Sequence, residues 1–328
     1  MSESRTFGSQ LLSGLRRLPI DTSLLAPLLA LLILLVVSSL ASEFFLNTRN
    51  ISNVLRQVSY TGIIAIGMTF VIIAGGIDLS VGSMLALVGV VLMYIVNAIA
   101  DPVQAVIMGM LGAVLVGALF GLFNGILVTK GRIAAFVVTL ASMSIFRSLA
   151  LYFTDAGEIT TRNPLFNNIG GGFFLGLPIP VWTFLAMAIV AHILLMHTAY
   201  GRHVCAVGSN AQVARYSGIR VQRVIMSTFV IAGVCVGVSA IMLASRLNSV
   251  SPSDAGYFYE LDAIAAVVIG GTALAGGRGS IWGTVIGALI LGIINNMLNL
   301  MGVSPYLQGL MKGAVILAAV LLQYRRNT

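Results

Sequence analysis

Two stretches, VIIAGGIDLSVGS from Val71 to Ser83 and VVIGGTALAGGRGS from Val267 to Ser280, decide how this chain folds. Each places a glycine pair directly after an apolar run that we expect to be shorter than a full membrane span. Glycine lets the backbone leave helical geometry, and the peptide groups freed in this way find no partners in hydrocarbon. Matching breaks in two halves of a chain are typical of a transport path. The two stretches therefore predict a membrane protein that moves a solute.

The composition is that of an integral membrane protein. Of the 328 residues, 58% are hydrophobic and only 9% are charged, whereas a soluble domain has about 25% charged residues. The net charge of +8 would indicate nucleic-acid binding in a soluble protein, but here the cations fall in loops and termini. The two cysteines, Cys205 and Cys235, form no motif, which predicts reduced thiols rather than a disulfide.

The apolar runs predict an all-α polytopic protein with about ten transmembrane helices, because a bilayer core of about 30 Å needs about 20 helical residues. The runs lie near residues 24–42, 58–75, 81–100, 104–129, 133–153, 173–198, 222–245, 261–275, 281–301 and 306–323. A leader at 1–23, a transmembrane domain at 24–323 and a tail at 324–328 follow. We expect the first run to be a retained helix rather than a signal peptide, since its leader is long and many spans follow.

The cations predict the orientation of these spans. With the amino terminus inside, twelve cations fall in the cytoplasm and only Arg49, Arg56, Arg162 and Arg246 fall outside. Positive charge favours the cytoplasmic side, so both termini are expected there. Both glycine-broken segments, near residues 75–80 and 270–279, then face the cytoplasm in the same orientation. This favours a diverged parallel repeat of spans one to four and seven to ten over two unrelated glycine-rich turns.

Asp78 is the most informative acid, and it has two interpretations. It follows the first glycine pair beside Ser80, where it can accept hydrogen bonds from amides at the helix start near Val81. It can also lie on the substrate path, because acids within a membrane are usually functional. We favour the structural role. The path or gate candidates are Gly75, Gly76, Asp78, Ser80, Asn124, Gly270, Gly271, Asn295 and Asn299.

The amides among these candidates can hydrogen-bond a sugar without imposing charge, although for any single amide a bond between helices is the more frequent use. No combination of side chains indicates catalysis, and the spacing of His192, His197 and His203 does not favour a metal site. Neither lysine, Lys130 or Lys312, stands in a phosphate-binding loop of the Walker A type. An ATPase that drove transport would therefore be a separate polypeptide.

The loop at 199–223 carries four arginines and no acid. Ser209 and Gln212 have the spacing of a capping box, and Gly218 offers a helix stop. A helix of about two turns between them is too short to be stable alone in water. It must pack against the membrane surface or against a cytoplasmic protein, and the composition does not choose between the two.

Several long stretches together resemble the ribose-type permease subunits of bacterial binding-protein-dependent ABC sugar importers, in the branched-chain amino acid/ribose permease superfamily. They are AIGMTFVIIAGGIDLSVGSMLAL (65–87), NGILVTKGRIAAFVVTLASM (124–143), GRHVCAVGSNAQVARYSGI (201–219), YELDAIAAVVIGGTALAGGRGSIWGTVIGALILG (259–292) and NNMLNLMGVSPYLQGLMKGAVILAAV (295–320). They cover most of the chain from the second span onward.

The resemblance implies a transport subunit of the bacterial inner membrane that is not itself an enzyme. It implies a second permease copy, a separate ATP-binding subunit that holds ATP and Mg, and a periplasmic sugar-binding protein. It also implies that residues 210–217 form the helix that couples to the ATPase. The coupling residues expected from it are Gly201, Arg202, Gly208, Ser209, Asn210, Ala214, Arg215 and Gly218. The rival is an ion-coupled secondary transporter, which would need titratable groups in mid-membrane.

Overall fold

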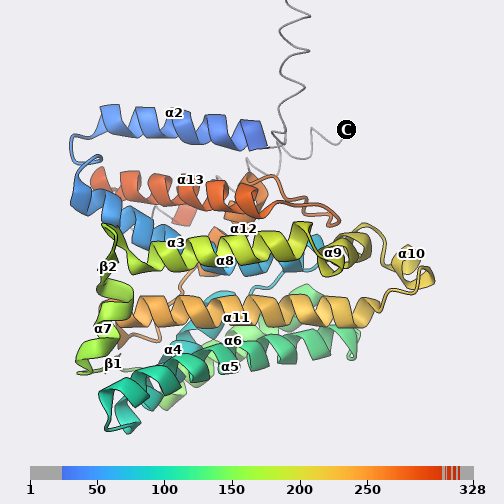
Figure 1. Ribbon diagram of the computed structural model, residues 1–328, viewed down its shortest axis with the longest axis horizontal. Helices are drawn as coiled ribbons and strands as arrows, with labels where there is room; N and C mark the ends of the chain where they lie inside the picture. Colours follow the sequence, from blue (N-terminus) through green and yellow to red (C-terminus); the bar gives the residue numbers. More distant parts are fainter. Residues whose placement is uncertain (1–23, 305–306, 308, 312, 315–316, 318–328) are drawn as a thin grey trace, which may run out of the picture.

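The computed structural model describes residues 24–304, 307, 309–311, 313, 314 and 317, and helices dominate these residues. Figure 1 shows long helices lying side by side. The helices are α2 (Leu25–Ala41), α3 (Thr48–Ile73), α4 (Val81–Ala98), α5 (Pro102–Thr129), α6 (Ala135–Phe153), α7 (Pro164–Gly171), α8 (Ile179–Met196), α9 (Ala199–Ser209), α10 (Ala211–Tyr216), α11 (Val221–Leu247), α12 (Tyr259–Ile269) and α13 (Ile281–Leu300).

Four very short strands make two small antiparallel pairs. β1 (Ile159–Thr160) pairs with β4 (Ser249–Val250), and β2 (Phe173–Phe174) pairs with β3 (Leu177–Pro178). The pair β1–β4 joins the segment after α6 to the end of α11, which is far away in the sequence. These strands lie at the opposite end of the molecule from α10 (Figure 1).

Each predicted apolar run that lies within the described residues contains a helix, but the run at 173–198 begins with the β2–β3 hairpin and becomes helical only at Ile179. Within the described residues, seven helices are long and apolar enough to cross a membrane, and α2, with 17 residues, is slightly shorter. The run at 261–275 becomes α12, which has only 11 residues. The leader at 1–23, the tail at 324–328 and most of the run at 306–323 lie outside the described residues. The all-α membrane class is thus confirmed.

One predicted length is wrong. The helix before the first glycine pair is not short: α3 has 26 residues and starts at Thr48, because the Asn47 side chain accepts a hydrogen bond of 2.9 Å from the Arg49 amide. The polar first half of this helix hid its true start in the sequence. Only the second pair follows a helix too short to span, namely α12.

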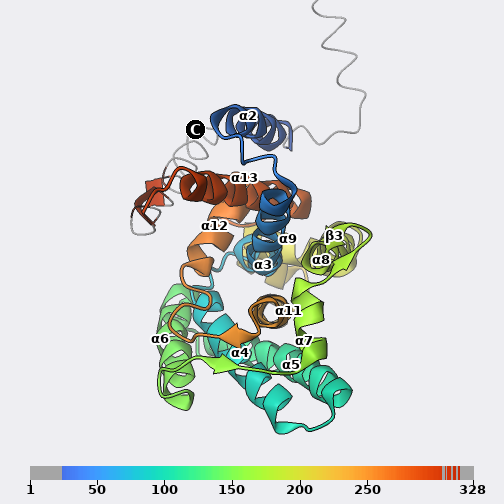
Figure 2. The same cartoon turned by 90° about the vertical axis from the view of Figure 1, so that its left-hand side faces the viewer.

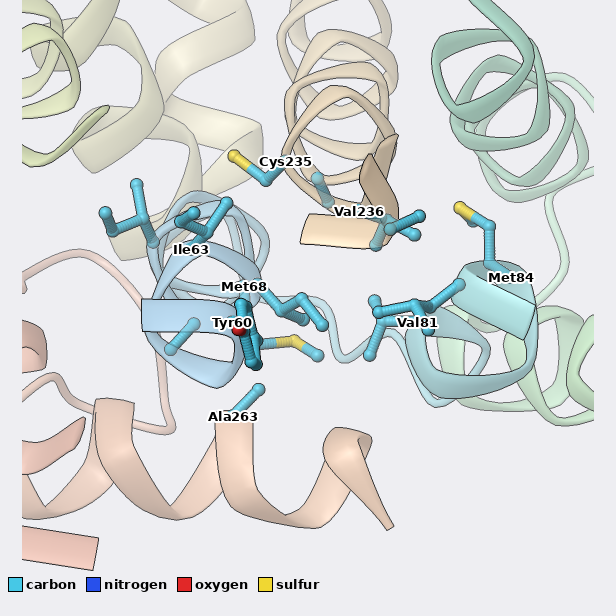
Figure 3. Close-up of a cluster of buried hydrophobic side chains, with 14 of the residues drawn as sticks. Tyr60, Ile63, Met68, Val81, Met84, Cys235, Val236 and Ala263 are labelled. Carbon is cyan, nitrogen blue, oxygen red and sulfur yellow. The ribbon is translucent and has the colours of Figure 1, made fainter. Parts of the chain in front are cut away.

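The centre of the molecule is formed by α3, α4 and α11, which are largely buried, while α5, α6 and α8 expose apolar side chains on their outer faces. Figure 2 shows α11 end-on among α3, α4, α5 and α8. In Figure 3, Ile63 of α3 lies next to Cys235 of α11, and Met68 of α3 extends toward Val81 of α4. Apolar faces left exposed by the outer helices must be covered by lipid or by another subunit.

Glycines allow α5 and α11 to pack in backbone contact. α5 and α11 cross where a Cβ added to Gly117 would lie 2.3 Å from the carbonyl oxygen of Gly233. A Cβ added to Gly121 would lie 2.2 Å from the carbonyl oxygen of Phe229. Small residues let backbones approach closely in membranes, where dispersion between helices replaces the hydrophobic effect. The α5–α11 pair is therefore fixed by backbone contact.

Candidate functional site

The two glycine segments form the same kind of turn at a helix end. At the end of α3, Gly75 N donates to Ile72 O and Gly76 N donates to Val71 O, both at 2.9 Å. At the end of α12, Gly271 N donates to Val268 O at 2.9 Å and Thr272 N donates to Val267 O at 3.1 Å. This paired pattern is the Schellman motif.

The left-handed residue of this motif is Gly75 in the first turn, with φ +86°, and Gly271 in the second, with φ +88°. By their hydrogen bonds, Gly75, the first glycine of its pair, therefore corresponds to Gly271, the second glycine of its pair. Gly270 is required for a different reason: a Cβ there would lie 2.4 Å from the carbonyl carbon of Gly283 in α13. Ala74 holds the same position in the first turn.

A chain of buried polar side chains anchors the first turn. Asp78 Oδ1 accepts hydrogen bonds from the amide of Ser80 at 2.9 Å and from its hydroxyl at 2.6 Å. Asn124 Nδ2 of α5 donates to Ser80 Oγ at 2.8 Å, and Ser142 Oγ of α6 donates to Asn124 Oδ1 at 2.6 Å. All four side chains are buried. The first turn is thus fastened to two neighbouring helices.

The structure supports the structural interpretation of Asp78, with one change of partner. Its carboxylate binds the Ser80 amide, which precedes α4, rather than the amides near Val81. Asp78 lies in the connection between α3 and α4, and burial raises the pKa of its carboxyl, an effect that the hydrogen bonds from Ser80 and Asn124 oppose. Oδ2 has no hydrogen-bond partner within the described residues. A neutral carboxyl fits this site better than an ionised one, because an unpaired buried charge is costly.

The second turn makes contact with the first turn and with α9 through backbone atoms. Gly277 N donates to Ile73 O, the last residue of α3, at 2.9 Å. Gly208 of α9 lies against both: a Cβ there would be 1.6 Å from Ile73 O and 2.6 Å from Gly277 N. We call this meeting of Ile73, Gly208 and Gly277 the glycine junction.

α10 follows the glycine junction without a flexible linker. Asn210 ends α9 and also caps α10, since its Oδ1 accepts hydrogen bonds of 3.0 Å from Gln212 N and from Val213 N. The predicted capping box of Ser209 and Gln212 is wrong, because Ser209 is the last residue of α9 and faces Gly277. Gly218, with φ +82°, follows α10, as expected for a helix stop.

α10 projects beyond the ends of the long helices (Figure 1). It packs inward through Ala214, which is buried, whereas Val213 is 57% and Tyr216 79% exposed. Arg202 and Arg215 are exposed at the same end of the molecule. Gly201 sets the start of α9 against the end of α8, since a Cβ there would lie 1.8 Å from Leu195 O. A two-turn helix that exposes apolar and aromatic side chains in this way is suited to a protein partner.

The other predicted path residues are not part of this region. Asn295 and Asn299 lie on α13, where Asn295 is buried and Asn299 is exposed. Their neighbour Asn296 exchanges two hydrogen bonds with Asn50 of α3, at 3.0 and 2.7 Å. The structure thus brings Asp78, Ser80 and Asn124 together and separates them from the asparagines of α13.

Sequence reasoning missed two parts of the site. Ser142 was recognised only as a polar residue within a span, and its bond to Asn124 depends on how α5 and α6 pack. Gly277 was part of the glycine-rich stretch but was not singled out. With a φ of +81°, it is one of three glycines in that stretch that have a left-handed backbone. The second glycine pair, Gly276-Gly277, was the available signal.

Known proteins resemble the chain over nearly its full length. Residues 50–320 match the family described as branched-chain amino acid transport system / permease component. The ribose import permease protein RbsC of Bacillus subtilis (strain 168) is 46% identical over 305 residues, 92% of this chain and 93% of that protein.

Two relatives named for other sugars are also similar. The D-allose transport system permease protein AlsC of Escherichia coli (strain K12) is 40% identical, over 89% of this chain and 88% of its own length. The L-arabinose ABC transporter permease protein AraH of Azospirillum brasilense is 38% identical, over 90% and 86%. No solved structure matches the chain.

Proposed function

The chain belongs to the family of branched-chain amino acid transport system permease components, and we propose that it is the permease subunit of an ATP-driven importer of a monosaccharide. The identity of 46% to a ribose import permease over 92% of the chain carries this proposal. The three relatives above are named for ribose, D-allose and L-arabinose, so a sugar is favoured over a branched-chain amino acid. Ribose or a related sugar is the proposed substrate.

The proposed orientation has about ten membrane crossings, one of which α12 makes together with the non-helical residues that flank it, and both termini in the cytoplasm of a bacterial inner membrane. One observation supports it: α10, both glycine turns and the α5–α6 connection gather at one end of the molecule (Figure 1). This end carries Lys130, Arg132, Arg215 and Arg278. Clustered cations favour the cytoplasmic side.

The proposed partners follow from the surface of the chain and from its relatives. A separate ATP-binding subunit, which holds ATP and Mg, would receive α10 through Val213 and Tyr216. A second permease copy would complete the translocation path, and a periplasmic sugar-binding protein would deliver the sugar at the opposite end. This chain supplies no ATPase site of its own in the proposal, and no cofactor.

The proposed mechanism is alternating access, transmitted through the glycine junction. Closure of the ATP-binding subunits displaces α10, and Asn210 passes this displacement to α9 because it ends one helix and caps the next. Gly208 lies in backbone contact with the end of α3 and with the loop after α12. A movement of α10 therefore reaches the glycine junction, where it displaces the loop after α12 relative to the end of α3, and the helices swing between outward-open and inward-open states.

Two exposed tyrosines offer a direct test. Tyr216 is 79% exposed on α10, and Tyr152 is 77% exposed at the other end of the molecule. The permease is reconstituted with its cognate ATP-binding subunit and sugar-binding protein. Two quantities are measured: the binding of the ATP-binding subunit to the permease, and ATP-driven ribose uptake. Tyr216→Ala should weaken that binding about tenfold or more, since aromatic anchors dominate interfaces. Tyr152→Ala should leave it unchanged.

Arg215→Glu on the same helix should likewise uncouple the ATPase from the loaded binding protein while the permease stays folded. Full coupling in both Arg215→Glu and Tyr216→Ala would contradict the role of α10. Sugar uptake that persists without the ATP-binding subunit, and that follows an ion gradient, would instead support a secondary transporter.

A further inference from the structure

A cavity of about 770 Å³ lies where α5, α10 and α11 come together at the end of the molecule that carries α10. Four arginines from three separate segments line it: Arg132 after α5, Arg215 of α10, and Arg220 and Arg223 at the start of α11. The described residues that line the cavity include no acid. Four permanent positive charges thus converge on one space.

This convergence is not explained by topology alone. The preference for cations on the cytoplasmic side concerns their number in each loop, and it does not require that exposed arginines of separate segments line one cavity. Like charges that line one space repel one another, so a bound anion would stabilise the arrangement. Arg132 also has a left-handed backbone, with φ +54°, which non-glycine residues adopt only where their surroundings favour it.

A second wall of the same cavity is apolar. Val128 from the end of α5, with Ile219, Val221 and Ile225 around the start of α11, lines it. The start of α11 has no side-chain cap, so its first turn adds positive potential there. Because α5 exposes most of its length to the surroundings, a lipid molecule can reach this end of the helix.

We propose that this cavity binds the phosphate headgroup of an anionic phospholipid, with the glycerol and upper acyl chains against its apolar wall. The volume lies in the range of sites for small organic molecules, whereas a free phosphate would fill only part of it and would leave the apolar wall without a partner. Basic pockets between membrane helices bind anionic headgroups in this way. The bound lipid connects the α5–α6 connection, through Arg132, to α10 and α11, through Arg215 and Arg220.

The cavity adjoins the surface of α10 that the proposed function gives to the ATP-binding subunit and shares Arg215 with it, so the variants that test the cavity leave Arg215 unchanged. Val213 and Tyr216 do not line it, while Ala211 and Arg215 do. The lipid site rests on the proposed orientation, which puts this end of the molecule at the cytoplasmic leaflet. It does not require that the ATP-binding subunit be present.

The test uses the full-length permease alone, stripped of lipid in detergent. Binding of dioleoylphosphatidylglycerol and of dioleoylphosphatidylcholine is measured by native mass spectrometry and by titration. Two double variants each remove two cations from the same end of the molecule. Arg132→Gln/Arg223→Gln changes the cavity, and Lys130→Gln/Arg202→Gln changes exposed residues that do not line it.

Wild type and the control variant should bind phosphatidylglycerol at least tenfold more tightly than phosphatidylcholine. The cavity variant should lose about tenfold or more of the affinity for phosphatidylglycerol. Arg132→Lys should retain most of this affinity if charge is what the lipid requires. Thermal melting confirms that each variant is folded, and Arg223→Gln alone replaces the double variant if the latter is not.

Three results would overturn the proposal. Equal loss in the cavity and control variants would indicate unspecific attraction to positive charge. Inorganic phosphate that binds as tightly as phosphatidylglycerol would assign the site to a free anion. Unchanged lipid binding in the cavity variant would remove the arginines from the lipid site, and weaker binding of the ATP-binding subunit by the same variant, measured separately, would assign them to that partner. Lipid binding is measured without the ATP-binding subunit, so its failure would leave the proposed transport function standing. Failure of the transport tests would likewise leave a measured lipid site standing.

Discussion

The two glycine turns share one hydrogen-bond pattern but differ in what holds them. The first follows a 26-residue helix and is fastened by buried side chains, from Asp78 through Ser80 and Asn124 to Ser142. The second follows an 11-residue helix, and its loop meets α3 and α9 through the backbone of Gly277. Buried side-chain networks rigidify their surroundings, whereas the loop of the second turn meets the end of α3 through one backbone hydrogen bond, from Gly277 N to Ile73 O. We infer that the first turn is an anchor and the second is the part that moves.

The largest effect is expected from Gly208→Ala. The added methyl group would collide with the backbone of Ile73, which cannot move as a flexible side chain can. Overpacking of this kind costs about 1–3 kcal/mol or forces the elements apart. Stimulation of ATP hydrolysis by the loaded binding protein should fall at least tenfold in proteoliposomes. Gly208→Pro would be a harsher change at the same contact and therefore a less informative one.

Gly112→Ala is the matched control for Gly208→Ala. It also adds a methyl group to a helical glycine, but the nearest atom is the end of the Ile95 side chain, which can turn away. Alanine is about 1 kcal/mol better than glycine within a helix, so stability should be equal or higher and coupling unchanged. If both variants behave alike, the contact of Gly208 with Ile73 has no special role.

Removal of the Asn124 side chain, which lies in the middle of the buried polar chain, should destabilise the first turn. Asn124→Ala takes away the acceptor for Ser142 and the donor to Ser80, and these buried groups then lack partners. The expected loss is about 1–3 kcal/mol, seen as a lower melting temperature in detergent. Asn296→Ala removes a pair with Asn50 that is only partly buried, and it should cost less. Equal losses would contradict the description of the first turn as the anchor.

Asp78→Asn tests the charge state of the anchor. Burial raises the pKa of Asp78, so the folded state favours the neutral carboxyl. The stability that this contributes is complete at acidic pH, below the unfolded pKa of about 4, and is lost as the pH rises through the raised pKa. Asn resembles the neutral form, so the variant should melt near wild type at acidic pH and above it at alkaline pH.

Asp78→Ala separates the hydrogen bonds from the charge. It removes the acceptor of both bonds from Ser80 and should destabilise the protein by about 1–3 kcal/mol at acidic pH, where Asp78→Asn does not. A loss of transport in Asp78→Asn at normal membrane yield would instead favour a role on the substrate path.

The smallest effects test whether the two turns are equivalent. Gly75 and Gly271 both have φ near +87° and nothing within 4 Å of an added Cβ, so only backbone strain opposes alanine. Each substitution should cost about 1–2 kcal/mol in chemical denaturation. Gly270→Ala should cost more, because its methyl group would meet the backbone of Gly283. If Gly270→Ala is the milder change, the match between the turns is wrong.

The sequence predicted the helices and the place of both turns, because apolar runs and glycine pairs are local signals. It did not show how the two turns match residue by residue, since Gly76 and Thr272 donate equivalent hydrogen bonds although one is glycine and the other is not. It found the short helix after Ser209 but named the wrong cap, because Ser209 and Asn210 are both good caps and only the packing against Gly277 decides between them.

The contacts that join distant segments could not be predicted. Gly208, Ile73 and Gly277 are far apart in the sequence, and no local pattern states that their backbones touch. The chain from Asp78 to Ser142 likewise depends on how α5 and α6 pack. The asparagines at 124, 295 and 299 form one class by composition, yet the fold uses the first in the anchor and places the others on α13.

The central claim is that displacement of α10 passes through Gly208 to the second turn. Hydrogen–deuterium exchange in the complex with the ATP-binding subunit, with and without nucleotide, tests it most directly. Nucleotide should change exchange in residues 270–280 much more than in residues 74–80. In Gly208→Ala this response should disappear, although α10 remains protected by the bound subunit. An unaltered nucleotide response at 270–280 in Gly208→Ala would contradict the account.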